Sequence, residues 1–394
     1  MPVTVKSFAK INLGLRIGPA RSDGFHELLT VYQTIGLYDV IRVSVARGSG
    51  VEIRCDDPRV PRDESNTCFR IAEKGKAVLR AKGRVVVEIE KRVPVQGGLG
   101  GASSNAVATL LGLERALRKE LPAAERLRIA AEVGSDLPLF LVGGAVLGVG
   151  RGEQVYPLPD FPATACVVVT PEIGVSTPKA FAEWDRRIEL GLKPVLSFDT
   201  DAALKRRSST RDSAASVDSS AENLGSKGNP AELCSARAFY SAQGRQPGAT
   251  VPTDTISQTA SASKLTVSHG SDRIGVLGYG LSAWLSGLYS SAPPRLVGGR
   301  AGNPLLALVR AGIENDFEQV VFPEYPELGE AKRALVRAGA KYASLSGSGS
   351  TLYGLFVSRQ GAASAVSRLR KAGWAAQGTW TLPRAAYWRR MIGS

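Results

Sequence analysis

The spacing of apolar and polar residues predicts a β-strand near the start of the chain and a strand–helix pair further along. Residues 3–17 alternate in character, which predicts a strand with two distinct faces, one bearing Val5, Ser7, Ala9 and Ile11 and the other Lys6, Phe8, Lys10 and Asn12. Residues 84–91 are rich in β-branched side chains and predict a second strand. Residues 106–114 have the composition and spacing of a helix.

The same patterns predict further elements along the chain. Helices are expected at residues 69–79, 126–133, 327–338 and 361–371, and one begins between residues 174 and 181. Strands are expected at residues 167–170, 342–345, 352–357 and 374–381, with a glycine-punctuated hairpin at residues 143–153.

The composition changes sharply at about residue 201. From there to about residue 272 the chain is rich in Ser, Ala, Gly and Thr and poor in large apolar residues. Such a segment buries too little apolar surface to offset its ordering entropy. We therefore predict a disordered insertion at residues 201–272, within the second of two domains that span residues 1–160 and 161–394.

A glycine-rich stretch joins the strand at residues 84–91 to the helix at residues 106–114. A helix start leaves backbone N–H groups unpaired, and these donors with the helix dipole suit phosphate oxygens. Glycines let the backbone approach the ligand, and we expect serines to cap the helix. The stretch is neither a Walker A loop nor a Rossmann fingerprint, and taken alone it could also be a tight turn. The candidate phosphate-binding residues are Pro94, Val95, Gln96, Gly97, Gly98, Leu99, Gly100, Gly101, Ala102, Ser103 and Ser104.

Composition and charge narrow the class of protein. Hydrophobic residues make up 43% of the chain and charged residues 22%, as in soluble globular proteins. The net charge is +14, but the basic residues form no dense tail and are not interleaved with aromatic residues. We therefore expect polyphosphate ligands and no nucleic acid. We find no long apolar run and no signal-peptide core, and we expect no membrane partner. The scattered cysteines fit a reducing compartment, and we expect the cytoplasm.

Three motifs resemble those of the GHMP small-molecule kinases, in that family's order. They are Phe8-Ala9-Lys10-Ile11-Asn12-Leu13, the stretch Pro94-x-x-x-Gly98-Leu99-Gly100-Gly101-x-Ser103-Ser104-Asn105, and the turn Ser346-Gly347-Ser348-Gly349-Ser350. The resemblance implies an α/β (α+β) fold of two domains, an N-terminal domain with a mixed sheet and helices on one side, and a C-terminal α/β sandwich. It implies that the glycine-rich stretch binds ATP and that Mg²⁺ accompanies it.

The resemblance also implies the catalytic residues. Gly134-Ser135-Asp136-Leu137-Pro138-Leu139-Phe140 matches a family phrase whose aspartate is the proposed general base, and Lys10 sits beside the phosphoryl acceptor. Asn12, in the first motif, is expected to bind substrate. From local sequence alone, Lys10 could be a solvated strand residue and Asp136 a helix cap. No carboxylate cluster suggests a metal cage, so we expect Mg²⁺ to be held largely by phosphate oxygens and water.

A further phrase, Arg21-x-Asp23-Gly24-Phe25-His26-Glu27-Leu28, resembles one branch of this family, whose substrate is a cytidine diphosphate ester. In that branch an aromatic residue stacks on the cytosine, here Phe25 where many members have tyrosine, and the next residue, here His26, hydrogen-bonds the base edge. An aromatic residue at the position of Phe181 covers the other face of the base. Turn packing by Phe25 and His26, and core packing by Phe181, are the structural alternatives.

The resemblance thus implies an ATP-dependent kinase that phosphorylates a hydroxyl of a cytidine diphosphate ester in isoprenoid biosynthesis. Another GHMP kinase, acting on homoserine, mevalonate or a sugar, is the alternative enzyme. A nucleotide-binding sensor without catalysis is the alternative from another class, although such a sensor would need only the glycine-rich stretch. We expect a monomer or a homodimer.

Overall fold

Two β-sheets organise the part of the chain that the computed structural model describes, residues 2–95, 97–190, 305–306, 309 and 313–392. The first has six strands in the order β3-β4-β2-β5-β6, with β1 paired to β2. Its strands are β1 (Val3–Ala20), β2 (His26–Ala46), β3 (Val51–Cys55), β4 (Arg84–Glu90), β5 (Ala145–Val149) and β6 (Gln154–Pro157). Because β3 and β4 are parallel and the other pairs antiparallel, this sheet is mixed, as predicted.

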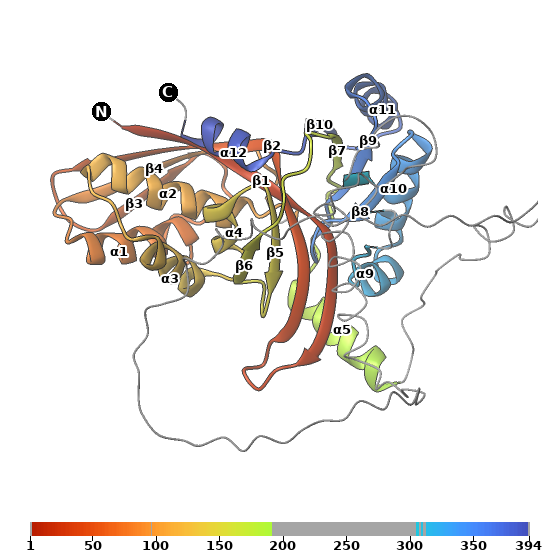
Figure 1. The fold of residues 1–394 in the computed structure, drawn as a ribbon, viewed down its shortest axis with the longest axis horizontal. Coiled ribbons are helices and arrows are strands. Elements are labelled where there is room, and N and C mark those ends of the chain that lie inside the picture. Colours follow the sequence, from red (N-terminus) through yellow and green to blue (C-terminus); the bar gives the residue numbers. More distant parts are fainter. Residues whose placement is uncertain (1, 96, 191–304, 307–308, 310–312, 393–394) are drawn as a thin grey trace, which may run out of the picture. The chain divides into compact units, whose positions relative to one another are not determined.

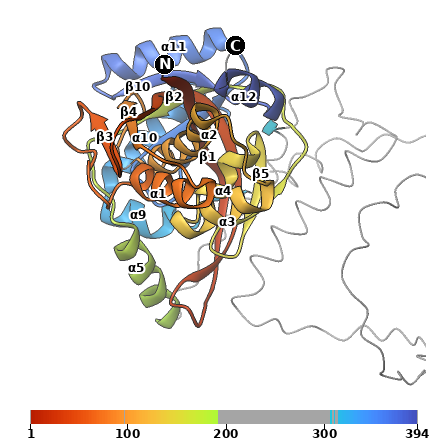
Figure 2. The same cartoon turned by 90° about the vertical axis from the view of Figure 1, so that its left-hand side faces the viewer.

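Helices cover one side of the first sheet (Figure 1). They are α1 (Thr67–Leu79), α2 (Gly101–Leu117), α3 (Ala123–Val133) and α4 (Leu137–Val142). Figure 2 shows α1 and α2 side by side, and α2 contacts β1 and β2 directly. An apolar cluster that includes Ile41, Val43, Val87, Leu110 and Leu113 fills the space between these helices and the sheet.

The second sheet has four antiparallel strands in the order β10-β7-β9-β8. They are β7 (Ala165–Val169), β8 (Tyr342–Leu345), β9 (Leu352–Phe356) and β10 (Ala376–Trp380). Its helical partners are α5 (Thr177–Glu189), α9 (Glu318–Glu324), α10 (Pro326–Arg337) and α11 (Arg359–Lys371), and α12 (Arg384–Met391) contacts β1. One face of the second sheet packs on the layer formed by α5, α9, α10 and α11, and the other face packs on the β1–β2 hairpin.

The predicted faces of β1 are wrong beyond Phe8. Val5 belongs to the apolar cluster under α2 and Ser7 donates a hydrogen bond to Ser104 of that helix, whereas Ala9, Ile11 and Leu13 belong to the cluster that faces the second sheet. The register shifts between Phe8 and Lys10, where the partner residue changes from Tyr38 to Thr34. This irregularity rotates the strand, and packing on both sides buries β1 from Ser7 to Ile17.

Most other predicted elements are confirmed within one to three residues, including α1, α3, α10 and α11 and the strands of the second sheet. The sequence analysis did not predict β2, β3, α4 or α12. The proposed insertion at residues 201–272 lies outside the described residues, as does Gln96, and the division at residue 160 stays a prediction.

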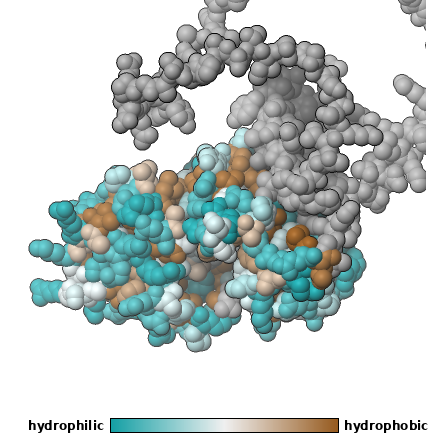
Figure 3. All heavy atoms as spheres, turned by 90° about the horizontal axis from the view of Figure 1, so that it is seen from below, coloured by the Kyte–Doolittle hydropathy of each residue, from teal (hydrophilic) through white to brown (hydrophobic). Residues whose placement is uncertain are grey.

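Hydrophilic residues predominate on the face shown in Figure 3, and apolar residues form separate patches there. Among the described helices, none is both long and apolar enough to span a bilayer.

Candidate active site

The structure brings Lys10 and Asp136 together, although they are far apart in the sequence. The Lys10 Nζ atom lies 3.3 Å from Asp136 Oδ2, and it donates a 2.6 Å hydrogen bond to Asn12 Oδ1. The Lys10 side chain is 4% exposed and that of Asp136 is 36% exposed. Asp136 precedes α4 but makes no capping hydrogen bond, so the helix-cap alternative does not describe its side chain. A buried ammonium therefore faces a carboxylate that solutes can reach.

Tyr32 on β2 completes this arrangement and was missed in the sequence. Its buried hydroxyl donates a 3.0 Å hydrogen bond to Asp136 Oδ1, and the Lys10 ammonium lies 5.5 Å from the centre of its ring. Burial, followed by the nearby Asp136 charge, raises the pKa of Tyr32 well above its usual value. The phenol therefore stays protonated and orients the carboxylate.

The glycine-rich loop packs directly on Lys10. The Lys10 backbone N–H donates a 2.9 Å hydrogen bond to the carbonyl of Leu99. Gly98 and Gly100 have φ angles of +76° and +68°, which glycine adopts without strain. A Cβ atom on Gly100 would lie 2.9 Å from the Phe140 ring and 3.0 Å from Lys10 Cγ. The glycines thus allow the loop to approach the catalytic candidates closely.

The prediction that serines cap the following helix is wrong. Gly100 is the N-cap of α2, without a side-chain capping bond, and Ser103 and Ser104 lie inside the first turn. Ser104 Oγ instead accepts a 2.7 Å hydrogen bond from Ser7 on β1. Ala102 lies in the helix and has no positive φ angle, so alanine is compatible with this position. The first N–H groups of α2 are consequently left for a ligand.

The turn at residues 346–351 closes over the glycine-rich loop. Thr351 N–H donates to the carbonyl of Gly97 at 3.1 Å, and Ser346 Oγ donates to that of Gly98 at 3.0 Å. A Cβ atom on Gly347 would lie 3.3 Å from Asn12 Oδ1 and 3.6 Å from Lys10 Nζ. All three motifs that resemble the kinase family therefore meet at one place.

A cavity of about 380 Å³ opens between the glycine-rich loop and the start of α1. Asn66, Lys91, Gly98, Ser103 and Asn105 are among the residues that line it. The Asn105 Oδ1 atom is buried without a partner in the described part of the chain. The cavity thus combines the backbone of the glycine-rich loop with the lysine cation, which suits a polar ligand with an anionic part.

Asp39 anchors the chain at the start of the glycine-rich loop. This fully buried carboxylate accepts hydrogen bonds from Lys91 Nζ at 2.5 Å, from the N–H groups of Arg92 and Val93 at 2.7 Å, and from Asn105 Nδ2 at 2.9 Å. It ties β2, the chain after β4 and the first turns of α2 to one point. No sequence motif indicated this role.

Asp39→Asn is expected to lower the free energy of unfolding by about 3 kcal/mol, because one buried ion-pair partner is removed. The amide also presents an N–H₂ group to neighbours that are themselves donors. Urea unfolding measures the change, with Asp23→Asn as the control. Asp23 forms an exposed ion pair with Arg21, so that change should be below about 1 kcal/mol. Equal losses in the two variants would contradict the anchoring role of Asp39.

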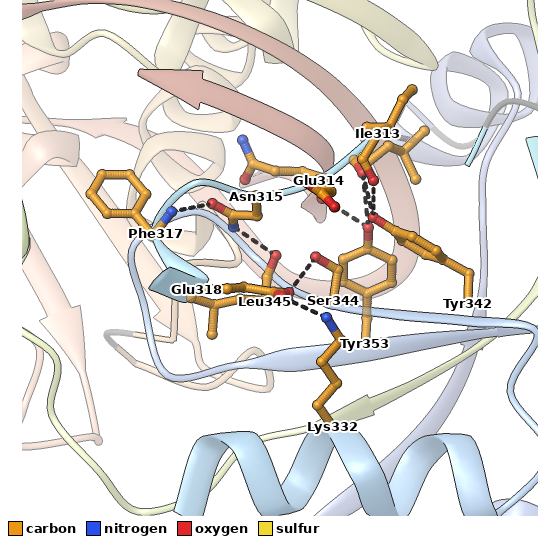
Figure 4. A network of polar contacts seen from close by, with 12 residues as sticks. Ile313, Glu314, Asn315, Phe317, Glu318, Lys332, Tyr342, Ser344, Leu345 and Tyr353 are labelled. Atoms are coloured by element: carbon orange, nitrogen blue, oxygen red, sulfur yellow. Dashed lines mark hydrogen bonds and ion pairs between the residues drawn. The ribbon is translucent and has the colours of Figure 1, made fainter. Parts of the chain in front are cut away.

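Asn315 anchors the turn at residues 346–351, and Figure 4 shows its contacts with Leu345 and Phe317. Its Nδ2 atom donates to the carbonyls of Leu345 and Gly347 at 2.9 and 2.8 Å, and its Oδ1 atom accepts from Phe317 N–H at 3.1 Å. Nearby, Glu318 accepts hydrogen bonds from Ser344 Oγ and Leu345 N–H and pairs with Lys332. Asn315 and Glu318 therefore hold the turn and the strand before it, and neither residue lines the cavity.

Two tyrosines extend this network to β1. Tyr353 donates a 2.9 Å hydrogen bond to the carbonyl of Asn12, and the Tyr342 hydroxyl lies 2.8 Å from the carbonyl of Ile313 and 3.1 Å from that of Leu13. Burial is the main cause that raises the pKa of both phenols. They remain neutral donors and hold β1, with Lys10 and Asn12, against the second sheet.

Asn315→Asp is expected to reduce stability by about 2 kcal/mol, because two buried carbonyls lose their donor and face a carboxylate. The loosened turn should also raise the KM for nucleotide. Thermal unfolding and a KM measurement test both effects. Ser344→Ala is the control, because it removes a hydrogen bond elsewhere in the network and should cost about 1 kcal/mol without changing KM. A normal KM in Asn315→Asp would contradict the link between this network and the cavity.

The three candidate base-binding residues lie near the end of the β1–β2 hairpin and α5. The rings of His26 and Phe181 stack with centres 5.0 Å apart and planes 11° apart, and Phe181 also meets Phe317 edge-on. Phe25 is 50% exposed, and the Arg151 guanidinium lies 4.9 Å from the centre of its ring. His26 therefore stacks on Phe181, whereas Phe25 lies apart from them with the Arg151 guanidinium over one face of its ring. Since His26 and Phe181 already touch, no base lies between those two rings.

The side chains near the glycine-rich loop could hold a metal ion only together with a bound phosphate ligand. The described residues contain no group of three His, Cys, Asp or Glu side chains that could hold an ion. Beside the glycine-rich loop, the Asp136 carboxylate is partly exposed, the Asp39 carboxylate is fully buried among its donors, and the hydroxyl residues Ser65, Thr67 and Ser103 line the cavity. This arrangement fits Mg²⁺ that retains water and phosphate oxygens as most of its ligands.

Comparisons with known proteins show which family this chain belongs to. The family model described as GHMP kinases N terminal domain matches residues 66–144, and that described as GHMP kinases C terminal matches residues 303–374. A 4-(cytidine 5'-diphospho)-2C-methyl-D-erythritol kinase crystal structure aligns with a TM-score of 0.59 and 23% identity, over 96% of this chain and 99% of that one. A mevalonate kinase crystal structure aligns with a TM-score of 0.57 and 10% identity, over 97% of this chain and 99% of that one. These structures share the fold and confirm the predicted fold class.

Curated relatives extend the match along the sequence. The 4-diphosphocytidyl-2-C-methyl-D-erythritol kinase of Solibacter usitatus (strain Ellin6076) is 32% identical over 355 residues, covering 90% of this chain and 81% of the relative. The protein of the same name from Synechococcus sp. (strain JA-2-3B'a(2-13)) is 30% identical over 369 residues, covering 93% and 89%. The chain therefore belongs to the 4-diphosphocytidyl-2-C-methyl-D-erythritol kinase family of the GHMP kinases.

Proposed function

We propose that this chain transfers the γ-phosphoryl group of ATP to the 2-hydroxyl of 4-diphosphocytidyl-2-C-methyl-D-erythritol. The products are the 2-phosphate and ADP, in the non-mevalonate pathway of isoprenoid biosynthesis. The observation that carries the proposal is the Lys10–Asp136 pair, 3.3 Å apart and directly beside the glycine-rich loop. A sensor that only binds nucleotide has no need of this pair. Membership of the family supports the choice of acceptor.

In this proposal Asp136 accepts the proton of the attacking hydroxyl. Its carboxylate is partly exposed, and Tyr32 and Lys10 hold one oxygen each. General-base catalysis of this kind requires an acceptor whose position is fixed relative to the nucleophile. The Lys10 ammonium then stabilises negative charge between the hydroxyl and the phosphoryl group, as positioned cations do in phosphoryl transfer.

The amide of Asn12, which the sequence analysis expects to bind substrate, contacts two side chains of the protein. Its Oδ1 atom accepts from Lys10 and its Nδ2 atom donates to Thr30 Oγ1 at 2.8 Å. Both ends of the amide are thus engaged within the protein. We propose that Asn12 chiefly orients the Lys10 ammonium, and that any contact with substrate uses the remaining capacity of these atoms.

We propose that ATP occupies the cavity beside the glycine-rich loop. The loop residues from Gly97 to Gly101 and the first turn of α2 direct backbone N–H groups toward the phosphates, and the helix dipole favours their charge. Mg²⁺, bound mainly through phosphate oxygens and water, supplies further charge neutralisation when present. The cytosine is proposed to contact Phe25, His26 and Phe181, with stacking on a ring face that needs no phenolic hydroxyl.

Coupled ADP release tests the reaction. The purified chain receives ATP, Mg²⁺ and one acceptor in each assay: 4-diphosphocytidyl-2-C-methyl-D-erythritol, homoserine, mevalonate, galactose or none. Turnover confined to the cytidine ester is the expected result. Turnover with another acceptor would overturn the choice of substrate. ATP binding without turnover in any assay would favour the sensor instead.

The remaining proposals concern the surroundings of the enzyme. We propose a cytoplasmic protein, monomeric or homodimeric, whose ligands are small polyphosphates and not nucleic acid. Nucleic-acid binding would instead appear as an association that weakens steeply with added salt.

A further inference from the structure

The two ring nitrogens of His26 have different surroundings. The Nε2 atom lies 2.7 Å from Asp185 Oδ1, whereas the described residues provide no hydrogen-bond partner for Nδ1. The side chain is 8% exposed, and its unpartnered Nδ1 atom is not fully buried. The Nδ1 atom therefore retains access to a ligand.

One face of α5 holds this ring. Phe181 and Asp185 are one helical turn apart on α5, so their side chains lie on the same face of the helix. Phe181 stacks on the flat face of the imidazole, and Asp185 binds its edge. Together they fix both the plane of the ring and the nitrogen that faces the helix.

The carboxylate also decides which nitrogen carries hydrogen. An ionised carboxylate only accepts hydrogen bonds, so Nε2 must be the protonated nitrogen when it binds Asp185. In a neutral imidazole the other nitrogen is then an acceptor, because the tautomer is set by the hydrogen bond that one nitrogen makes. Nδ1 of His26 is thereby an acceptor without a donor among the described residues.

From this geometry we infer that Asp185 is a specificity-determining positioning residue, which holds His26 in the Nε2–H tautomer and so selects a 4-aminopyrimidine over a 4-oxopyrimidine. The 4-amino group of cytosine donates a hydrogen bond, whereas the 4-oxygen of uracil only accepts one. An acceptor at Nδ1 therefore binds the 4-amino group of cytosine and repels the 4-oxygen of uracil. The inference rests on the proposed function, in which a cytosine contacts His26.

The discrimination between two bases tests this role. We compare kcat/KM for 4-diphosphocytidyl-2-C-methyl-D-erythritol with that for its uridine analogue, in the unaltered chain and in Asp185→Asn. An asparagine can present either an oxygen or an N–H to Nε2, so it no longer imposes one tautomer. The ratio of cytidine to uridine kcat/KM should fall about 10- to 100-fold, through loss of cytidine activity and gain of uridine activity.

A matched control lies on the same helix. Glu183→Gln removes a partly exposed carboxylate that pairs with Arg186 and does not contact His26, and it should keep the original ratio. An unchanged ratio in Asp185→Asn would overturn the inference, whether or not both activities fall together. That result would leave the proposed function intact, whereas absence of cytidine turnover in the unaltered chain would refute the proposed function itself.

Nitrogen NMR reports the tautomer directly. The chain has only two histidines, His26 and His269, so a His269→Gln variant assigns the imidazole signals. With ¹⁵N-labelled histidine, the unaltered chain should show a protonated Nε2 and an unprotonated Nδ1 for His26, and Asp185→Asn should show exchange between tautomers. A protonated Nδ1 in the unaltered chain, in either a neutral or a charged ring, would overturn the inference. The measurement needs no substrate and is therefore independent of catalytic activity.

Discussion

Asp136→Asn is expected to lower kcat by about 10²- to 10⁴-fold, because an amide cannot accept the proton of the attacking hydroxyl. Asparagine has the same shape as aspartate, and its oxygen still accepts the hydrogen bond from Tyr32. The site should therefore keep its geometry while it loses the base. We measure kcat at saturating ATP and cytidine ester, and we measure binding of cytidine diphosphate by calorimetry.

The binding measurement separates a chemical role from a structural one. Cytidine diphosphate should bind nearly as tightly as to the unaltered chain, because the proposed base contacts involve other residues. Glu330→Gln is the control for loss of a carboxylate, since Glu330 lies on α10 and pairs with the exposed Arg333 and Arg337. If nucleotide binding collapsed along with kcat, Asp136 would be a structural residue.

Gly98→Ala is expected to lower kcat/KM for ATP by at least about 100-fold, the cost of displacing a binding loop by about 1 Å. Gly98 has a φ angle of +76°, which alanine adopts only with strain. Its new Cβ atom would lie 2.1 Å from the carbonyl oxygen of Ser346 and 3.2 Å from Gly349 Cα. Both obstacles are backbone atoms, so the loop and the turn over it must separate.

A second glycine provides the control for this prediction. Gly378 lies in β10, and a Cβ atom there would be 3.5 Å from Val366, an ordinary contact distance. Gly378→Ala should leave kcat/KM unchanged, and both variants are assayed by coupled ADP release with ATP varied. Normal kinetics in Gly98→Ala would contradict the proposal that close packing of loop and turn shapes the ATP site.

Much of the candidate site was evident in the local sequence. Lys10, Asp136 and the glycine-rich stretch stand in recognisable phrases, and the structure places them side by side. Elements with a strong periodic pattern, such as α1 and β4, also appear where the pattern predicts them. Such features depend on residues close together in the chain, whose spacing decides which face is apolar and where a helix begins.

The supporting residues could not be found in this way. Tyr32, Asp39 and Asp185 carry no local signal, and each acts on a partner distant in the sequence. Likewise, the faces of β1 depend on an irregularity in its pairing with β2, and the serines expected to cap α2 are inside the helix.

The residue types and their order along the chain thus indicated the family, the candidate phosphate-binding loop and the candidate catalytic pair of Lys10 and Asp136. The orientation of those groups came from tertiary packing, through buried donors and acceptors that must find partners wherever the fold brings them. Asp136 illustrates the difference. Its motif marks it as a candidate base, but its position is determined by Tyr32 and Lys10, which only the folded sheet places within hydrogen-bond or ion-pair distance.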